Sequence, residues 1–285
     1  MNNADHRVCI LTDSTAQFPV SSYPGRELVK VIPLHIRYDD KIYPDDKSLG
    51  FSELPPSLRN GACLEVYPPS PQDFYRIYFA LGQKYGQIIT ILPSERLNPA
   101  MRSAHKAASS GMGWVSLPLI DSQTTGVGLG LIVQAAAEAA YNGASAAEIQ
   151  RYVRLIIPRV YTLVCAQSLT YMAHSGHIGP TQAVIGEMLG LSALFTLENG
   201  QLTLVQKVSS GRHLLDQLLD FITEFGALKH IAVFRGHIPF DQDTRQLHER
   251  IGEIYPAAPY SEHFIGTSLA ISLGPRSLGI TVLEN

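Results

Sequence analysis

The sequence predicts an α/β protein of two domains: an N-terminal parallel sheet with helices on both faces, and a C-terminal mixed α+β sheet. The first half repeats a unit of buried strand, polar loop and helix three times, which is typical of a parallel sheet. The second half contains apolar runs joined by Asn199-Gly200, a strong hairpin signal. The 285 residues suffice for two domains of about 140 residues each. We place the boundary near Pro158, giving domains 1–158 and 159–285.

Apolar runs and polar loops define the elements of the first domain. We expect its strands at residues 8–12, 28–36, 87–92 and 115–120. Pro33 interrupts the second of these and must sit at a strand end or a sheet edge, because it has no amide donor. Helical spacing and capping residues predict helices at residues 51–58, 70–81, 99–109, 127–141 and 146–156.

The second domain is expected to mix strands and helices. The predicted strands are residues 160–166, a hairpin over 193–208, then 231–235, 265–272 and 279–283. Amphipathic spacing predicts helices at residues 211–225 and 243–254. In sheets of the first domain's kind, ligands bind beyond the carboxyl ends of the strands. Polar loops that contain Asp13, Ser94 and Asp121 follow three of those strands.

Charge is scarce in this chain. Charged residues make up 16% of it, against roughly 25% in an ordinary domain, while the hydrophobic fraction of 45% is ordinary. The net charge is −3, from 22 basic and 25 acidic residues, and no long basic run occurs. A nucleic-acid-binding protein usually carries a basic surface, and a disordered chain has few apolar residues. Both classes are therefore disfavoured.

The cysteines and the apolar segments indicate a cytoplasmic protein. Cys9, Cys63 and Cys165 are odd in number and have apolar neighbours, so we expect reduced, buried thiols. The N-terminal residues lack the pattern of a signal peptide. The most apolar stretch, residues 126–140, is shorter than the ~20 residues of a membrane span. We predict a buried helix there and no transmembrane segment.

Common catalytic and cofactor signatures are absent or incomplete. The nearest match to a nucleophile elbow, residues 266–270, ends in Ala270 instead of glycine. Gly126, Gly128 and Gly130 miss the spacing of a dinucleotide loop by one residue, so we expect them to serve helix packing. His174 and His177 have no evident third ligand. We predict neither a metal nor a cofactor.

Short motifs along almost the whole chain carry a family resemblance. They are Thr12-Asp13-Ser14-Thr15, Val31-Ile32-Pro33-Leu34, Pro69-Ser70-Pro71, Ile120-Asp121-Ser122 with Gly128-Leu129-Gly130, Ser175-Gly176-His177-Ile178, and Gly274-Pro275 before Leu278-Gly279-Ile280. In this order and spacing the series resembles the DegV family. The resemblance implies two α/β domains that enclose one long-chain fatty acid. It also implies presentation of that acid to a fatty-acid kinase, whose acyl phosphate product feeds phospholipid synthesis, and no enzymatic activity of the binding protein itself.

The expected head-group contacts of the family are largely replaced. Val66 stands where the resemblance implies a threonine that donates to the ligand carboxylate, and Asn98 begins the segment where Ser-Gly-Thr is expected. His177 replaces an arginine and Ser272 a histidine, while Arg276 replaces a glycine. The candidate ligand contacts are Ser94, Ser272, His177, Arg276, Ser70, Val66 and Asn98. Arg276 could bind a carboxylate bidentately or could simply be a solvated loop residue.

Two alternatives remain open beside fatty-acid binding. One is a divergent family member that binds another amphiphile and has lost the kinase partner. The other is a small-molecule hydrolase that uses Ser94 or Ser272 with a histidine. Glu95 would repel a carboxylate if it faced the pocket, so we expect it to point outwards. Asp13 and Asp121 are expected to cap the helices that follow them.

Overall fold

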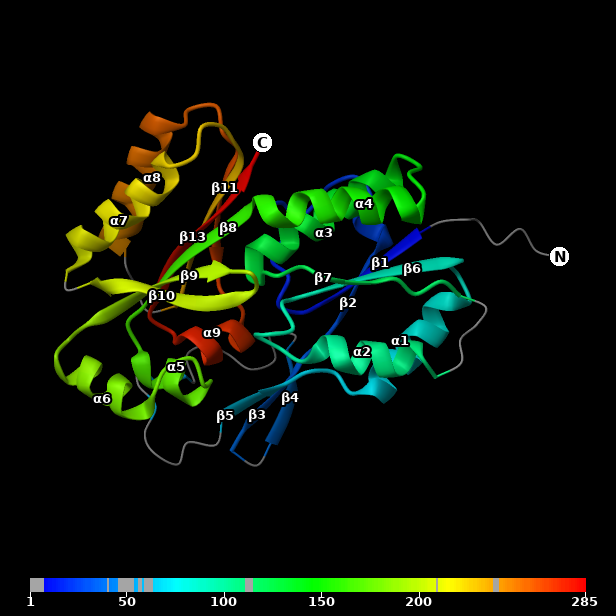
Figure 1. Cartoon of the computed structure of the whole chain (residues 1–285), viewed down its shortest axis with the longest axis horizontal. Helices are drawn as coiled ribbons and strands as arrows, with labels where there is room; N and C mark the ends of the chain where they lie inside the picture. Colours follow the sequence, from blue (N-terminus) through cyan, green and yellow to red (C-terminus); the bar gives the residue numbers. More distant parts are fainter. Residues whose placement is uncertain are drawn as a thin grey trace.

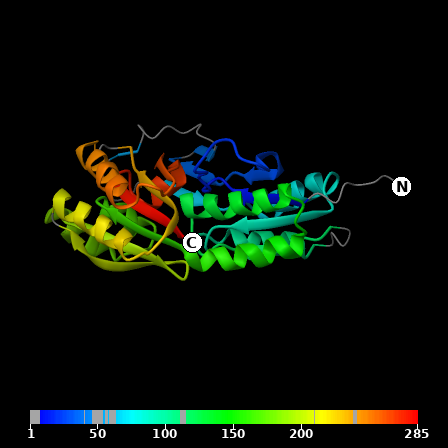
Figure 2. The ribbon, with the colours of Figure 1, turned by 90° about the horizontal axis from the view of Figure 1, so that it is seen from above.

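Two main sheets, each with helices on both faces, lie end to end in an elongated molecule (Figures 1 and 2). The computed structural model describes residues 8–39, 41–45, 54–55, 58, 64–110, 115–208, 210–237 and 241–285. The helix predicted at residues 51–58 lies mostly outside the described residues. The predicted fold class, a parallel sheet followed by a mixed sheet, is confirmed.

The first sheet is fully parallel, as predicted. Its strands are β1 (Val8–Asp13), β2 (Val29–Ile32), β6 (Gln87–Leu92) and β7 (Leu119–Asp121), in the order β2-β1-β6-β7. The last strand is shorter than the predicted 115–120, since Ser116 forms only an isolated bridge with Gln87. Helices α1 (Pro71–Gly82) and α2 (Ala100–Ala108) cover one face, and α3 (Gly126–Tyr141) and α4 (Ala146–Ile156) cover the other.

The predicted strand 28–36 is in fact two strands in different sheets. The strand β2 ends at Ile32, and β3 (His35–Tyr38) then joins a small antiparallel sheet with β4 (Lys41–Pro44) and β5 (Leu64–Tyr67). Pro33 lies between β2 and β3, which confirms its predicted place at a strand end. Because proline cannot donate to a ladder, the chain leaves the first sheet at this point.

The second main sheet draws all its strands from residues after Pro158. They are β8 (Val160–Ala166), β9 (Ser192–Glu198), β10 (Gln201–Val208), β11 (Leu228–Arg235), β12 (Tyr260–Phe264) and β13 (Ser277–Glu284). Their order is β10-β9-β8-β13-β11-β12, and every pair is antiparallel except β11 with β12. The predicted hairpin is confirmed, with Asn199 and Gly200 both at positive φ in the turn. The domain boundary itself stays a prediction.

Helices also cover both faces of this sheet. Two of them, α7 (Gly211–Thr223) and α8 (Asp241–Ile254), pack on one face. The other face meets α5 (Leu169–His174), α6 (Pro180–Met188) and α9 (Thr267–Leu273). Short 3-10 turns lie at Arg26–Leu28 and Ile157–Arg159.

The strand predicted at residues 265–272 is wrong, because this segment forms α9. Its apolar and small residues are buried on almost every side, so they show no amphipathic pattern that separates a helix from a strand. The sequence prediction also missed β12 and the helices α5 and α6.

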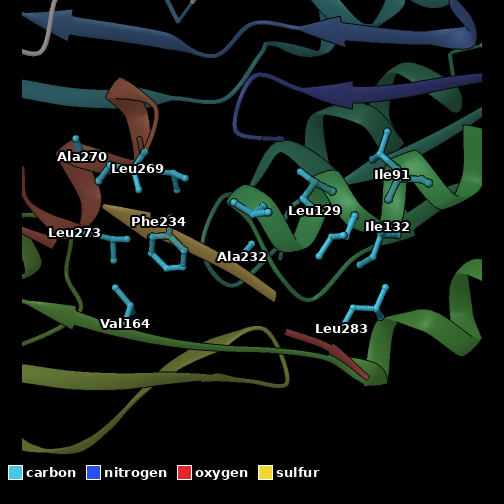
Figure 3. Close-up of a cluster of buried hydrophobic side chains, with 14 of the residues drawn as sticks. Ile91, Leu129, Ile132, Val164, Ala232, Phe234, Leu269, Ala270, Leu273 and Leu283 are labelled. Atoms are coloured by element: carbon cyan, nitrogen blue, oxygen red, sulfur yellow. The ribbon is translucent and has the colours of Figure 1, made fainter. Parts of the chain in front are cut away.

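One apolar core joins the two halves of the molecule. It runs from the first sheet through α3 to the inner face of the second sheet and to α9. Figure 3 shows Ile91 of β6, Leu129 and Ile132 of α3, Val164 of β8, Phe234 of β11, and Leu269 and Leu273 of α9. Two further clusters fill the outer faces, under α1 and α2 and under α7 and α8. The shared core therefore places α3 and α9 between the sheets.

The packing role predicted for the α3 glycines is confirmed. A Cβ on Gly130 would lie 1.9 Å from the carbonyl oxygen of Gln17, and a Cβ on Gly128 would lie 2.4 Å from Thr124 Oγ1. No side chain fits at these distances. Only glycine at these positions lets α3 approach the loop after β1 so closely.

We expect Gly130→Ala to lower the free energy of unfolding by about 1–3 kcal/mol or more, the cost of overpacking a tight contact. The matched control is Gly252→Ala in α8, because nothing lies within 4 Å of its Cβ position. That control should gain up to about 1 kcal/mol, since alanine favours helix over glycine. Urea denaturation measures both variants, and equal effects would contradict the close-approach account.

Candidate functional site: a cavity between α3, α9 and the second sheet

The described residues enclose a narrow cavity where α3 and α9 face the inner side of the second sheet. It holds about 790 Å³ of space, including its opening to solvent. Its lining residues come from both halves of the chain: Thr15, Gln17, Leu34, Val66, Pro93, Leu97, Asn98, Thr125, Gly126, Val127, Thr162, Val164, His177, Leu197, Leu202, Phe234, Ile265, Ser268, Leu269, Ser272, Leu273 and Thr281.

The side of the cavity towards the second sheet is mainly apolar. Alternate residues of a strand point to the same face, so Val164 and Phe234 project inwards while Leu163 and Val233 pack under α7 and α8. Figure 3 shows Val164, Phe234, Leu269 and Leu273 pointing towards one another. The Thr162 and Thr281 hydroxyls share one hydrogen bond of 2.9 Å. This surface suits a hydrocarbon chain.

Apart from His177 and the Thr162–Thr281 pair, the polar side chains at the cavity come from α9 and from loops of the first domain. Ser272 donates its hydroxyl to the Ser268 carbonyl at 3.2 Å, while the buried Ser268 hydroxyl has no partner in the described residues. Asn98 accepts from the Ala100 amide at 2.9 Å through its side-chain oxygen. Gln17 donates its amide to the Phe264 carbonyl, which leaves its buried Oε1 without a partner.

The cavity contains no formal charge in the described part of the chain. None of its lining residues is Asp, Glu, Lys or Arg, and burial lowers the pKa of His177, so this imidazole is neutral at pH 7. The start of α3 contributes an electrostatic feature of its own, because Thr125, Gly126 and Val127 line the cavity and Thr125 makes no side-chain cap. The free amides of a helix start carry a partial positive charge.

A family model described as "Uncharacterised protein, DegV family" matches residues 7–285. The chain belongs to the DegV family. A DegV domain-containing protein of Caldanaerobacter subterraneus is 28% identical over 225 residues, covering 77% of this chain and 78% of the relative. One of Deinococcus radiodurans is 22% identical over 280 residues, covering 96% of this chain and 98% of the relative.

Solved DegV structures share the fold of this chain. A fatty-acid-binding DegV family protein from Thermus thermophilus superposes with a TM-score of 0.83 at 23% identity, covering 98% of this chain and all of the other. A DegV protein from Eubacterium eligens, loaded with heptadecanoic acid, gives 0.82 at 16% identity with the same coverage. The fatty acid kinase (Fak) B3 protein of Streptococcus pneumoniae, loaded with linoleic acid, gives 0.83 at 18% identity, again with the same coverage.

Four of the seven candidate contacts line the cavity of this DegV family protein, namely Val66, Asn98, His177 and Ser272. Ser94 is buried nearby, but its hydroxyl donates to the Gly200 carbonyl at 2.6 Å and so links the first domain to the β9–β10 hairpin. Ser70 is exposed and caps α1 with a capping box. Arg276 is exposed and does not line the cavity.

Two residues that the sequence did not single out as ligand contacts, Gln17 and Ser268, carry orphaned buried atoms at the cavity. Ser268 has a weak sequence signal, because it is a polar residue within an apolar segment, but the sequence predicts a strand there. Gln17 gave none, because its place beside α3 depends on the tertiary fold.

Three acidic residues near the strand ends have structural partners. Glu95 points away from the cavity and pairs with Arg102 at 3.0 Å, which agrees with the expected outward direction. The expected helix capping by Asp13 and Asp121 is wrong. Both carboxylates accept from loop amides two residues ahead, Thr15 at 3.0 Å and Gln123 at 2.8 Å. No group of three or more potential metal ligands occurs among the described residues.

Asp13 is an unusual, buried carboxylate. It is fully buried, and its Oδ2 has no partner in the described residues. Burial raises its pKa to about 7, although hydrogen bonds from Thr15 oppose the shift. Since the folded pKa exceeds the unfolded one, the folded state binds this proton more tightly. The stability from this group is present below about pH 4 and is lost as the pH rises towards 7.

We expect Asp13→Asn to remove this pH dependence, because the amide keeps an acceptor for Thr15 and has no proton to lose. The stability of the variant relative to the wild type should rise by roughly 2–3 kcal/mol between pH 5 and pH 8. Urea denaturation at both pH values provides the measurement. Asp121→Asn, in a similar but half-buried turn, is the control for replacing a carboxylate that accepts from a loop amide. A pH-independent difference for Asp13→Asn would contradict the assignment.

Proposed function

We propose that this protein binds one long-chain fatty acid, with the acyl chain in the cavity between α3, α9 and the second sheet. The apolar inner face formed by Val164, Phe234, Leu269 and Leu273 carries the proposal. Burial of a sixteen-carbon chain contributes about 12 kcal/mol gross, at roughly 0.8 kcal/mol per methylene. Desolvation of the carboxylate costs several kcal/mol unless hydrogen bonds replace its water. The chain then supplies affinity, and the polar residues set orientation.

The family neighbours support this ligand class. The fatty-acid-binding DegV protein from Thermus thermophilus and the DegV protein from Eubacterium eligens loaded with heptadecanoic acid have the same fold as this chain. A cavity between the two halves of this chain, with no charged lining residue among those described, fits the same kind of occupant.

We further propose that the protein presents the bound acid to a fatty-acid kinase. In that reaction the ligand carboxylate attacks the terminal phosphorus of a nucleoside triphosphate, and the products are an acyl phosphate and the diphosphate. The acyl phosphate would then enter phospholipid synthesis. The structural likeness to the Fak B3 protein of Streptococcus pneumoniae supports this partner. The binding protein would hold the acid without catalysing the transfer.

The side-chain contacts favour binding over hydrolysis. Ser94 bonds to the Gly200 carbonyl and the Arg96 amide, and Ser272 bonds to the Ser268 carbonyl. In the described part of the chain, no hydrogen bond joins either serine to a histidine. A serine hydrolase needs such a base within hydrogen-bond reach of its nucleophile.

A cytoplasmic location suits this role. No helix in the described residues has both the length and the apolar character for crossing a bilayer. Cys9 and Cys165 are free and buried, and burial raises the pKa of both thiols to about 12. Such thiols are unreactive and fit a reducing compartment.

Leu202→Trp should abolish or strongly weaken fatty-acid binding, because Leu202 lines the cavity and the larger indole side chain would fill it. Leu204→Trp, two residues along β10 and exposed, is the matched control. We expect delipidated wild type and L204W to bind palmitate in calorimetry and to show one adduct in native mass spectrometry, with L202W at least tenfold weaker. Absence of binding by the wild type, or wild-type affinity in L202W, would contradict the proposed site.

The kinase partnership has its own test. Purified protein loaded with palmitate should support ATP consumption and acyl phosphate formation by a bacterial fatty-acid kinase subunit, and the L202W variant should not. Failure of the loaded wild type would overturn the kinase role and leave lipid binding intact.

A further inference from the structure

We propose that Ser268, together with the start of α3, anchors the head group of the ligand. This inference rests on the proposed function and specifies its polar contact. The sequence pointed to Ser94 and Ser272 for this role, and the structure favours a different serine.

Ser268 has the properties of an unused donor. Ser268 is 2% exposed and lines the cavity, and its hydroxyl has no partner within the described residues. A buried hydroxyl without a partner is costly, so a ligand that accepts its hydrogen bond gains affinity. Ser272, one turn later on α9, already donates to the Ser268 carbonyl at 3.2 Å. Ser94 is likewise engaged, with the Gly200 carbonyl.

The start of α3 supplies the complementary charge. This helix has 16 residues, and its N-cap Thr125 makes no side-chain bond to the first amides. Gly126 and Val127 both line the cavity. The two helices are close here, because a Cβ on Gly126 would lie 3.2 Å from Leu269 Cδ1 of α9. Because Ser268, Gly126 and Val127 line the same cavity, an anionic group there can meet the hydroxyl and the helix start together.

The remaining polar groups do not replace this pair. His177 is neutral at pH 7 because burial lowers its pKa, and Val66 has no side-chain donor. Gln17 turns its amide towards Phe264, so its free Oε1 beside Gly126 can only accept. A carboxylate gains nothing from that oxygen, whereas a ligand hydroxyl would donate to it. A neutral alcohol is therefore an informative second probe.

The test compares Ser268→Ala with Ser272→Ala, using palmitate and hexadecanol as probes in calorimetry. We expect S268A to lose about tenfold or more in palmitate affinity, as for a hydrogen bond to a charged group. Its hexadecanol affinity should change less than threefold, because the alcohol carries no charge. S272A should stay within about threefold of the wild type for both probes. Thermal unfolding verifies that each variant folds.

Three results would overturn the anchor. S268A could bind palmitate like the wild type, its affinity for both probes could fall in parallel, or S272A could lose as much affinity as S268A. If S268A does not fold, two other variants replace it: Ser268→Thr, which keeps the hydroxyl, and Ser268→Cys, whose thiol is a weak donor. Equal palmitate affinity of these two variants would reject the proposal. In each case palmitate binding by the wild type keeps the proposed function. Absence of that binding would instead reject the function itself.

Discussion

The burial of the first half of α3 on every side is the constraint on which the rest of the structure depends. Residues 126–133 of this helix are all buried, and its glycines let it press against the loop after β1. A helix that is apolar all round needs neighbours all round. The first sheet supplies one side, and the second sheet with α9 supplies the other. The cavity exists because α9 and the second sheet face the start of this helix without filling all the space there.

The scarcity of charge takes a specific form in this arrangement. Only 16% of the residues are charged, and no described residue that lines the cavity is among them. In the proposed anchor, the partners of an anionic head group are a hydroxyl and helix amides instead of a guanidinium. Arg276, which stands where the family resemblance implies a glycine, is exposed and does not line the cavity. In the proposed fatty-acid site, apolar residues would hold the acyl chain and neutral polar groups would hold the head group.

The parallel sheet, its four helices and the Asn199-Gly200 hairpin could be predicted, because local periodicity and turn chemistry determine them. The sequence also identified Val66, Asn98, His177 and Ser272, which line the cavity. It failed where residues are buried on all sides, as in α9, since such segments show no distinctive period. The sequence also could not show which of Ser94 and Ser268 has a hydroxyl without a partner. Which hydroxyl is free depends on a partner distant in sequence, the Gly200 carbonyl.

A crystal structure of the protein with 16-bromohexadecanoic acid tests the central claim, that an acyl chain occupies this cavity, most directly. The account predicts one strong anomalous bromine peak among the apolar residues on the second-sheet side, near Val164 and Phe234, with the carboxylate towards Ser268 and the start of α3. An empty cavity at saturating ligand, or a bromine peak outside it, would contradict the account.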